Sequence, residues 1–149
     1  MFNIRPAKPS EAPLIVDFQL HMALESEGVQ LDRETLTAGV AAVFDGYTQA
    51  GYWIAEDEKQ VVGMLMTMPE WSDWRNGIVL WIHSVYVMHQ ARRRGVFRSM
   101  YDHLHRMIRE SDKLVGLRLY VDKSNKDAQS VYQTMGMTGE HYDLYEWLK

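Results

Sequence analysis

The 149-residue sequence contains no cysteine, which excludes disulfides, thiolate zinc sites and a cysteine nucleophile. Its apolar runs are short, and none approaches the roughly 20 residues that a membrane-spanning helix needs. The first residues show no basic segment followed by an apolar run, so we expect no signal peptide. These absences predict a cytoplasmic protein that does not act through a membrane.

Excess positive charge is also missing, since 16 lysines and arginines stand against 20 aspartates and glutamates. The net charge of -4 argues against a general nucleic-acid binder. Neither the Gly-x-x-x-x-Gly-Lys-Ser/Thr motif nor Gly-x-Gly-x-x-Gly occurs, so we expect neither a P-loop enzyme nor a dinucleotide dehydrogenase. Any anion site must therefore come from a local cluster of residues.

The spacing of apolar residues predicts one domain over residues 1–149, built from alternating helices and strands. Expected helices begin near Ser10, after Asp32, at Val96 and after Ser124. Expected strands cover residues 2–5, 52–55, 60–68, 78–87, 117–121 and 137–148, with a loop at 69–77. This order predicts an α/β fold in which about four helices flank both faces of a mixed sheet. The last two crossovers should connect parallel strands.

A basic turn follows the most apolar of these strands and precedes a helix. Unpaired amides in the first turn of a helix attract anions, and Gly95 lets a ligand approach the backbone. A solvated basic loop is the alternative, although ligands in open α/β sheets bind beyond the carboxyl ends of strands. The candidate anion site comprises Val85, Tyr86, Val87, Arg92, Arg93, Arg94, Gly95, Val96, Phe97, Arg98 and Ser99.

Two blocks of sequence resemble the GNAT acetyltransferase superfamily. The first is the Arg92-x-x-Gly95-x-Phe97 turn after Val85–Val87, with Phe97 where that family commonly has Gly or Ala. The second is an Asn-x-x-Ala-x-x-x-Tyr block followed by Gly, formed by Asn125, Ala128, Tyr132 and Gly136. A weaker likeness, over Glu70–Arg75, is to the diamine (polyamine) acetyltransferase branch.

The resemblance implies acetyl-CoA as acyl donor and direct transfer of its acetyl group to an amine, without a metal. The residues of the basic turn would then hold the donor together with Asn125, Ala128 and Tyr132. Tyr132 stands in the place of the family's general acid, which protonates the leaving thiolate. Dimers are frequent in this superfamily, so a homodimer is expected.

Residue chemistry adds candidates for the base and for the amine pocket. His83 has an ordinary pKa near neutrality, which suits a general base, and a satisfied histidine between strands is equally compatible. Glu25 and Glu27 are candidates for binding a substrate ammonium, or form a solvated helix end. Trp71 and Trp74 either wall an amine pocket through cation–π contacts or pack their loop.

Without the motif, the position of Tyr132 on an apolar helix face predicts a core residue. Within the second block it is predicted to be the acid. The sequence thus predicts an N-acetyltransferase for a small amine or polyamine-like acceptor. Two alternatives remain: an enzyme that acetylates proteins or peptides, and a non-catalytic acyl-CoA-binding module.

Overall fold

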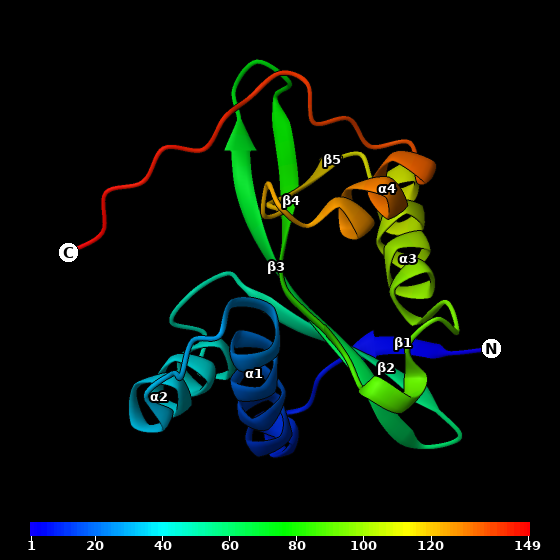
Figure 1. The fold of residues 1–149 in the computed structure, drawn as a ribbon. Coiled ribbons are helices and arrows are strands. Elements are labelled where there is room, and N and C mark those ends of the chain that lie inside the picture. The colour runs from blue at the N-terminus through cyan, green and yellow to red at the C-terminus, as the bar shows by residue number, and fades with distance from the viewer. The chain divides into compact units, whose positions relative to one another are not determined.

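The computed structural model describes all 149 residues, which form two compact units, Met1–Leu119 and Tyr120–Lys149. The first unit contains a five-stranded sheet in the order β1-β2-β3-β4-β5 (Figure 1). Neighbouring strands are antiparallel except for β4 and β5, which are parallel. The strands are β1 (Asn3–Pro6), β2 (Gly51–Asp57), β3 (Gln60–Ser72), β4 (Gly77–Val87) and β5 (Leu114–Leu119).

Three α-helices and two short 3-10 helices complete the first unit. They are η1 (Pro9–Glu11), α1 (Ala12–Glu27), α2 (Arg33–Phe44), η2 (His89–Ala91) and α3 (Val96–Glu110). The mixed α/β architecture predicted from the sequence is confirmed, and the β4-α3-β5 crossover is parallel as expected. None of the helices has the length and apolarity that crossing a membrane requires.

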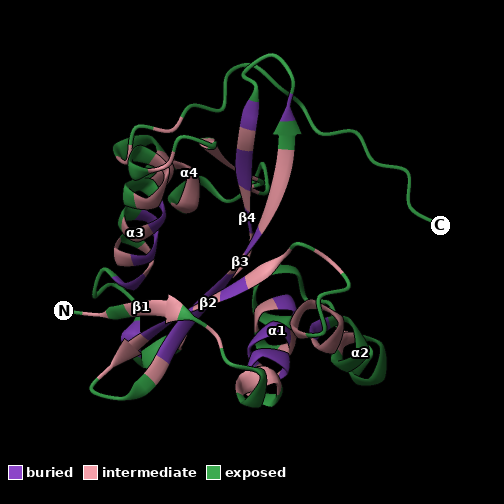
Figure 2. Ribbon diagram, turned by 180° about the vertical axis from the view of Figure 1, so that it is seen from behind, coloured by how far each residue is buried: buried purple, intermediate pink, exposed green.

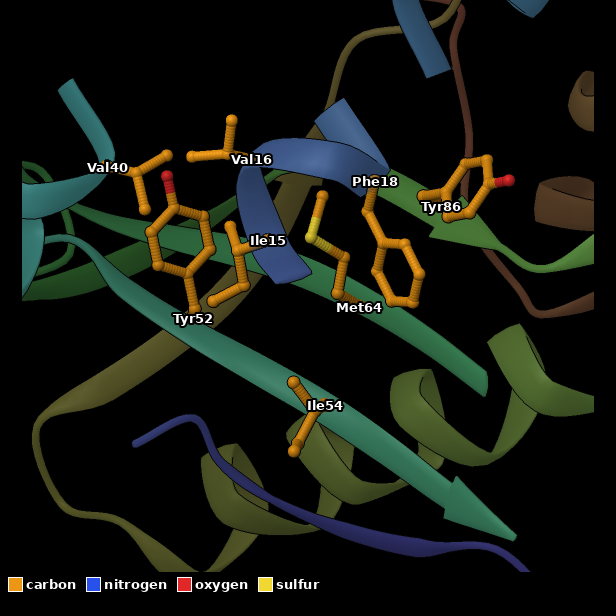
Figure 3. Close-up of a cluster of buried hydrophobic side chains, with 8 residues drawn as sticks. All are labelled: Ile15, Val16, Phe18, Val40, Tyr52, Ile54, Met64 and Tyr86. Atoms are coloured by element: carbon orange, nitrogen blue, oxygen red, sulfur yellow. The ribbon is translucent and has the colours of Figure 1, made fainter. Parts of the chain in front are cut away.

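The helices cover opposite faces of the sheet because side chains alternate along each strand. Tyr52 and Ile54 of β2 belong to a buried cluster with α1 and α2, whereas Trp53 lies 5.2 Å from the His103 ring of α3. Figure 2 shows buried stretches along β2, β3, β4 and the inner side of α1. The cluster in Figure 3 consists of Ile15, Val16, Phe18, Val40, Tyr52, Ile54, Met64 and Tyr86.

Two local signals work as the sequence indicates. The Asp32 carboxylate accepts a hydrogen bond of 2.8 Å from the Thr35 amide and so caps α2. Gly28, with φ of 64°, ends α1 in the left-handed conformation that glycine adopts without strain.

The β3–β4 hairpin is longer than predicted, because residues 69–72 form strand and not loop. Pro69 pairs with Leu80 and Ser72 with Gly77, so the connecting turn is confined to residues 73–76. Pro69 lacks an N–H, but β2 begins at Gly51, opposite Thr67, so β3 has only β4 as a neighbour at Pro69. A proline is tolerated at this position because no second ladder is lost.

The second unit contains one helix, α4 (Lys126–Thr134). Its cap is Asn125, not the predicted Ser124, whose amide instead donates to Asp122 Oδ1 at 2.7 Å. The strand predicted at 137–148 is not formed, and this prediction is wrong for the chain as described. An alternating pattern alone does not make a strand, since an unpaired strand leaves its backbone groups without partners, and this unit offers no other strand.

Candidate active site

A β-bulge interrupts β4 just before its carboxyl end. Met64 of β3 faces Tyr86 and Met66 faces His83, so Ser84 and Val85 together oppose one residue of β3. Ser84 adopts a left-handed φ of 54°, which is uncommon for a residue other than glycine. Bulges bend a strand and release backbone groups from the ladder, and they occur frequently beside active sites.

The basic turn leads from this strand end into α3. Gly95 has φ of 83°, and α3 begins directly after it at Val96. The Ser99 amide donates to Gly95 O at 3.0 Å, so the amides of Val96, Phe97 and Arg98 precede the first helical bond. No heavy atom lies within 4 Å of the place where a Gly95 Cβ would stand. The turn therefore presents open space and the positive end of a helix dipole, which suits a phosphate group.

Phe97 does not delay the start of α3, although the related motif commonly has a small residue there. Its ring lies 6.5 Å from that of Tyr101, one turn further along the same helix. The side chain thus follows the helix axis while the amide geometry at Gly95 is kept.

Most arginines of the turn are already paired. Arg94 contacts Asp57 at 2.6 Å, Arg98 lies 3.9 Å from Asp102, and Arg92 pairs with Glu25. Arg93 takes part in none of these ion pairs, and its own φ is 62°. Attraction for an anion at the turn therefore rests on the backbone amides and on Arg93 more than on a sum of four arginine charges.

The start of α3 is packed closely on β3. A Cβ added at Gly63 would lie 2.9 Å from Val96 Cγ1 and 3.1 Å from the Tyr86 carbonyl oxygen. Real Cβ atoms essentially never come closer than 3.0 Å to another heavy atom, so any larger residue at position 63 would require Val96 to shift. Gly63 thereby allows the start of α3 to lie close against β3 and β4.

A pocket of about 290 Å³ opens between the end of α1 and the end of β4. The Arg92 guanidinium spans it, since it pairs with Glu25, donates from Nε to Val87 O at 3.0 Å and lies 5.9 Å from the centre of the Tyr86 ring. Burial, with Glu25 as a second cause, raises the pKa of Tyr86. The lining residues are Met22, Glu25, Ser26, Val85, Tyr86, Val87 and Arg92.

The structure thus brings Glu25 to the residues of the basic turn but leaves Glu27 outside this pocket. It also separates the two tryptophans from it. Trp71 pairs with Ile78, seven residues and roughly 20 Å along β4 from Val85. Trp74 lies in the turn beyond, and both indoles are exposed.

His83 faces the same side of the sheet as Met66, which packs on the cluster beneath α1. Its ring stacks on Trp81, with centroids 6.2 Å apart and planes 16° from parallel. Burial lowers the pKa of His83, so its imidazole is neutral over a wider pH range than a free histidine. A neutral imidazole is the form that accepts a proton.

Sequence reasoning missed the residues that surround Trp81. The Glu70 carboxylate accepts hydrogen bonds from Trp81 Nε1 and from Arg118, the latter at 2.9 Å. The Arg118 guanidinium also lies 5.9 Å from the Trp81 ring centre. The sequence predicts a loop at Glu70, whereas the structure places it on β3 opposite Val79.

In the second unit, Asn125 and Ala128 act together at the start of α4. Asn125 Oδ1 accepts from the Ala128 amide at 3.1 Å, which is the geometry of a helix cap. Tyr132 is half-buried, and burial raises its pKa, so the phenol keeps its proton well above neutral pH. No group of three or more histidine, cysteine or acidic side chains that would hold a metal ion is found.

Comparison with known proteins identifies the family of the chain. The model of the acetyltransferase (GNAT) family matches residues 19–137. No curated protein matches the sequence.

Solved structures also resemble it. A possible acetyltransferase from Clostridium difficile 630 is 36% identical with a TM-score of 0.92, covering 100% of this chain and 98% of that one. A predicted acetyltransferase with acetyl-CoA from Clostridium acetobutylicum shares 22% identity and a TM-score of 0.72, over 100% and 95% of the two chains. An aminoglycoside acetyltransferase in complex with sisomicin, from an uncultured soil metagenomic sample, shares 16% identity and a TM-score of 0.74, over 99% and 95%. Since the family model spans most of the sequence, the chain belongs to the GNAT family and is an acetyl-CoA-dependent acyltransferase.

Proposed function

We propose that the enzyme transfers the acetyl group of acetyl-CoA directly to a primary amine of a small, multiply cationic molecule of the polyamine type. The observation that carries the proposal is the pocket between α1 and β4, which joins the Glu25 carboxylate to the strand end and turn where the donor would bind. A carboxylate there suits a second ammonium group of the acceptor. The likeness to the diamine acetyltransferase branch points to the same acceptor class.

On this proposal, the donor lies along Val85–Val87, with its pyrophosphate at the start of α3. The backbone at the first turn of α3 and the Arg93 side chain bind the phosphates, because the positive end of the helix dipole lies there and Arg93 takes part in none of the ion pairs of the turn. Residues 1–149 act as one catalytic domain, in which Asn125 and Ala128 contact the pantetheine arm. Arg92 joins in binding the phosphates when its guanidinium leaves Glu25, and the remaining turn residues hold the backbone in place.

Transfer begins with removal of a proton from the acceptor amine. An alkyl ammonium with a pKa near 10.4 costs about 4–5 kcal/mol to deprotonate at pH 7. His83, with its lowered pKa, takes this proton directly or through water. The neutral amine then attacks the thioester carbon, and a backbone N–H freed by the β4 bulge donates to the oxyanion.

The attack forms the C–N bond. Collapse of the tetrahedral intermediate restores the carbonyl and breaks the C–S bond, and the nitrogen releases its extra proton to water. Tyr132 gives its proton to the leaving CoA thiolate and regains one from solvent. The raised pKa of Tyr132 keeps the phenol protonated before each turnover. The Tyr132→Phe variant is expected to lower kcat with CoA affinity kept, and unchanged kcat would remove Tyr132 from this role.

The acceptor class is tested by CoA release from acetyl-CoA with 1,4-diaminobutane, spermidine, butylamine, amino acids and peptides with free N-termini. We expect the diamine and spermidine to have the highest kcat/KM. The Glu25→Gln variant should lose that preference while keeping its rate with butylamine. A preference for peptides would refute the small-amine acceptor.

The proposal includes a homodimer in the cytoplasm, the compartment that a cysteine-free sequence suits. Residues 137–149 expose alternating aromatic side chains, with Tyr145 90% and Trp147 88% exposed, and β5 is an edge strand. A second copy would cover such apolar surface. Light scattering should report a dimer, and the double variant Tyr145→Ser, Trp147→Ser should shift it to monomer; a monomeric wild type contradicts this.

A further inference from the structure

We propose that Arg92 and Glu25 form an exchangeable ion pair that couples binding of the acetyl donor to binding of the cationic acceptor. This inference rests on the proposed function, because it takes the basic turn as the donor site and Glu25 as an acceptor ligand. The pair joins the last turn of α1 to the first arginine of the basic turn, residues 67 positions apart. Its partners both line the pocket at the end of β4.

The pair is suited to exchange because water reaches both partners. The side chains of Arg92 and Glu25 are 40% and 42% exposed. Ion pairs at that exposure contribute little net stability, since both charges remain well solvated when separated. Arg92 also stays in place without Glu25, because its Nε donates to Val87 O at 3.0 Å. The Arg92 Nε therefore stays bonded to Val87 O, while the terminal nitrogen that contacts Glu25 changes partner.

Each ligand competes for one member of the pair. A donor phosphate at the turn attracts Arg92 and releases the Glu25 carboxylate, while an acceptor ammonium attracts Glu25 and releases Arg92. Either ligand thus removes an obstacle to the other, and linkage requires the effect to be equal in both directions. Without ligands, the charges of Arg92 and Glu25 neutralise each other. With both ligands bound, Arg92 faces a donor phosphate and Glu25 faces an acceptor ammonium.

Among the arginines of the turn, Arg92 is placed to exchange between Glu25 and a donor phosphate. Arg94 pairs with Asp57 and Arg98 with Asp102, and neither acid lines the pocket. Arg93 takes part in no such pair. A direct link between the donor turn and the acceptor pocket therefore passes through Arg92 and Glu25.

The test measures the Kd of CoA by calorimetry for the full-length wild type, Glu25→Gln, Arg92→Gln and the double variant. The control is Glu27→Gln, which removes the same charge from the same helix end but lies outside the pocket. We expect Glu25→Gln to tighten CoA binding about 2- to 5-fold, the range of an exposed ion pair. In the Arg92→Gln background the same change should have no effect, and Glu27→Gln should leave Kd within experimental error.

Three outcomes overturn the coupling: unchanged or weaker CoA binding in Glu25→Gln, equal tightening in Glu27→Gln, or equal tightening in the Arg92→Gln background. Unchanged or weaker binding in Glu25→Gln means that Glu25 holds Arg92 in its donor-binding position. Equal tightening in Glu27→Gln or in the Arg92→Gln background means that the loss of any negative charge nearby tightens CoA binding, without a role for the ion pair. Failure of the proposed function is a separate result. It would appear as no CoA binding by the wild type, or as turnover that requires no amine.

Discussion

Gly63 offers a direct test of how the fold positions the donor site. In the Gly63→Ala variant the new methyl group would lie 2.9 Å from Val96 Cγ1 and 3.1 Å from the Tyr86 carbonyl oxygen. The carbonyl belongs to the neighbouring strand β4 and has little freedom to move. Relief must therefore come largely from Val96, which is buried at the first position of α3.

The expected cost follows from two opposing effects. Overpacking a well-filled core typically destabilises by about 1–3 kcal/mol. Replacing glycine by alanine returns about 0.4–1 kcal/mol by restricting the unfolded chain. The net loss lies between about 0 and 2.6 kcal/mol, which for a protein of this size lowers Tm by up to roughly 10 °C. Displacing Val96 also moves the start of α3, where we propose that the donor phosphates bind, so KM for acetyl-CoA should rise.

Gly116→Ala is the matched control, because a methyl group there meets only the Val79 methyls at an ordinary 3.9 Å. Circular dichroism gives Tm, and initial rates of CoA release give KM for acetyl-CoA. Adding Val96→Ala to Gly63→Ala removes the nearest clashing atom, so the two changes should be less than additive. If Gly63→Ala melts no lower than Gly116→Ala and keeps the wild-type KM, the close packing of α3 on β3 does not set the donor site.

Three further predictions concern other parts of the chain. Burial lowers the pKa of His83, so the acid limb of the kcat/KM profile should lie below pH 6.5 and disappear in His83→Gln; a limb that persists assigns the base to another group. Arg5 lowers the pKa of Glu11 and Glu56, so their contribution to stability is full above the unfolded value of 4.5 and is lost as pH falls through the folded values. Arg5→Met should therefore flatten the dependence of Tm on pH in this acid range, and an unchanged slope contradicts the assignment. Asn125→Ala should cost α4 about 1 kcal/mol and speed amide exchange over the helix, whereas Asn125→Asp should keep the cap; equal exchange in both variants would show that the cap is unimportant.

Those parts of the fold that are determined by residues a few positions apart could be predicted from the sequence. Asp32 caps α2 because its carboxylate reaches an amide three residues away, and Gly95 precedes α3 because glycine accepts a positive φ. The β4-α3-β5 unit, and with it the place of the basic turn, follows from apolar periodicity over neighbouring residues. The family resemblance rested on these same local blocks.

Predictions for other segments failed because their structure depends on pairing with a strand that is distant in the sequence. Residues 69–72 look like a loop by composition, yet they are strand because residues 77–80 lie opposite them. Residues 137–148 alternate like a strand, yet they form none without a neighbouring strand in their unit. The β4 bulge at Ser84 also depends on register with β3, which no local pattern encodes.

The sequence by itself determined the family resemblance and the segments predicted to bear chemistry: the basic turn, the Asn125–Tyr132 block and His83. Only the tertiary structure decided which of their charges are available. It paired Arg92 with Glu25 and Arg94 with Asp57, placed Trp81 and His83 face to face, and kept Trp71 far from the pocket. The physical reason is that ion pairs and stacking act over a few ångströms in space, between residues that the chain separates by as many as 67 positions.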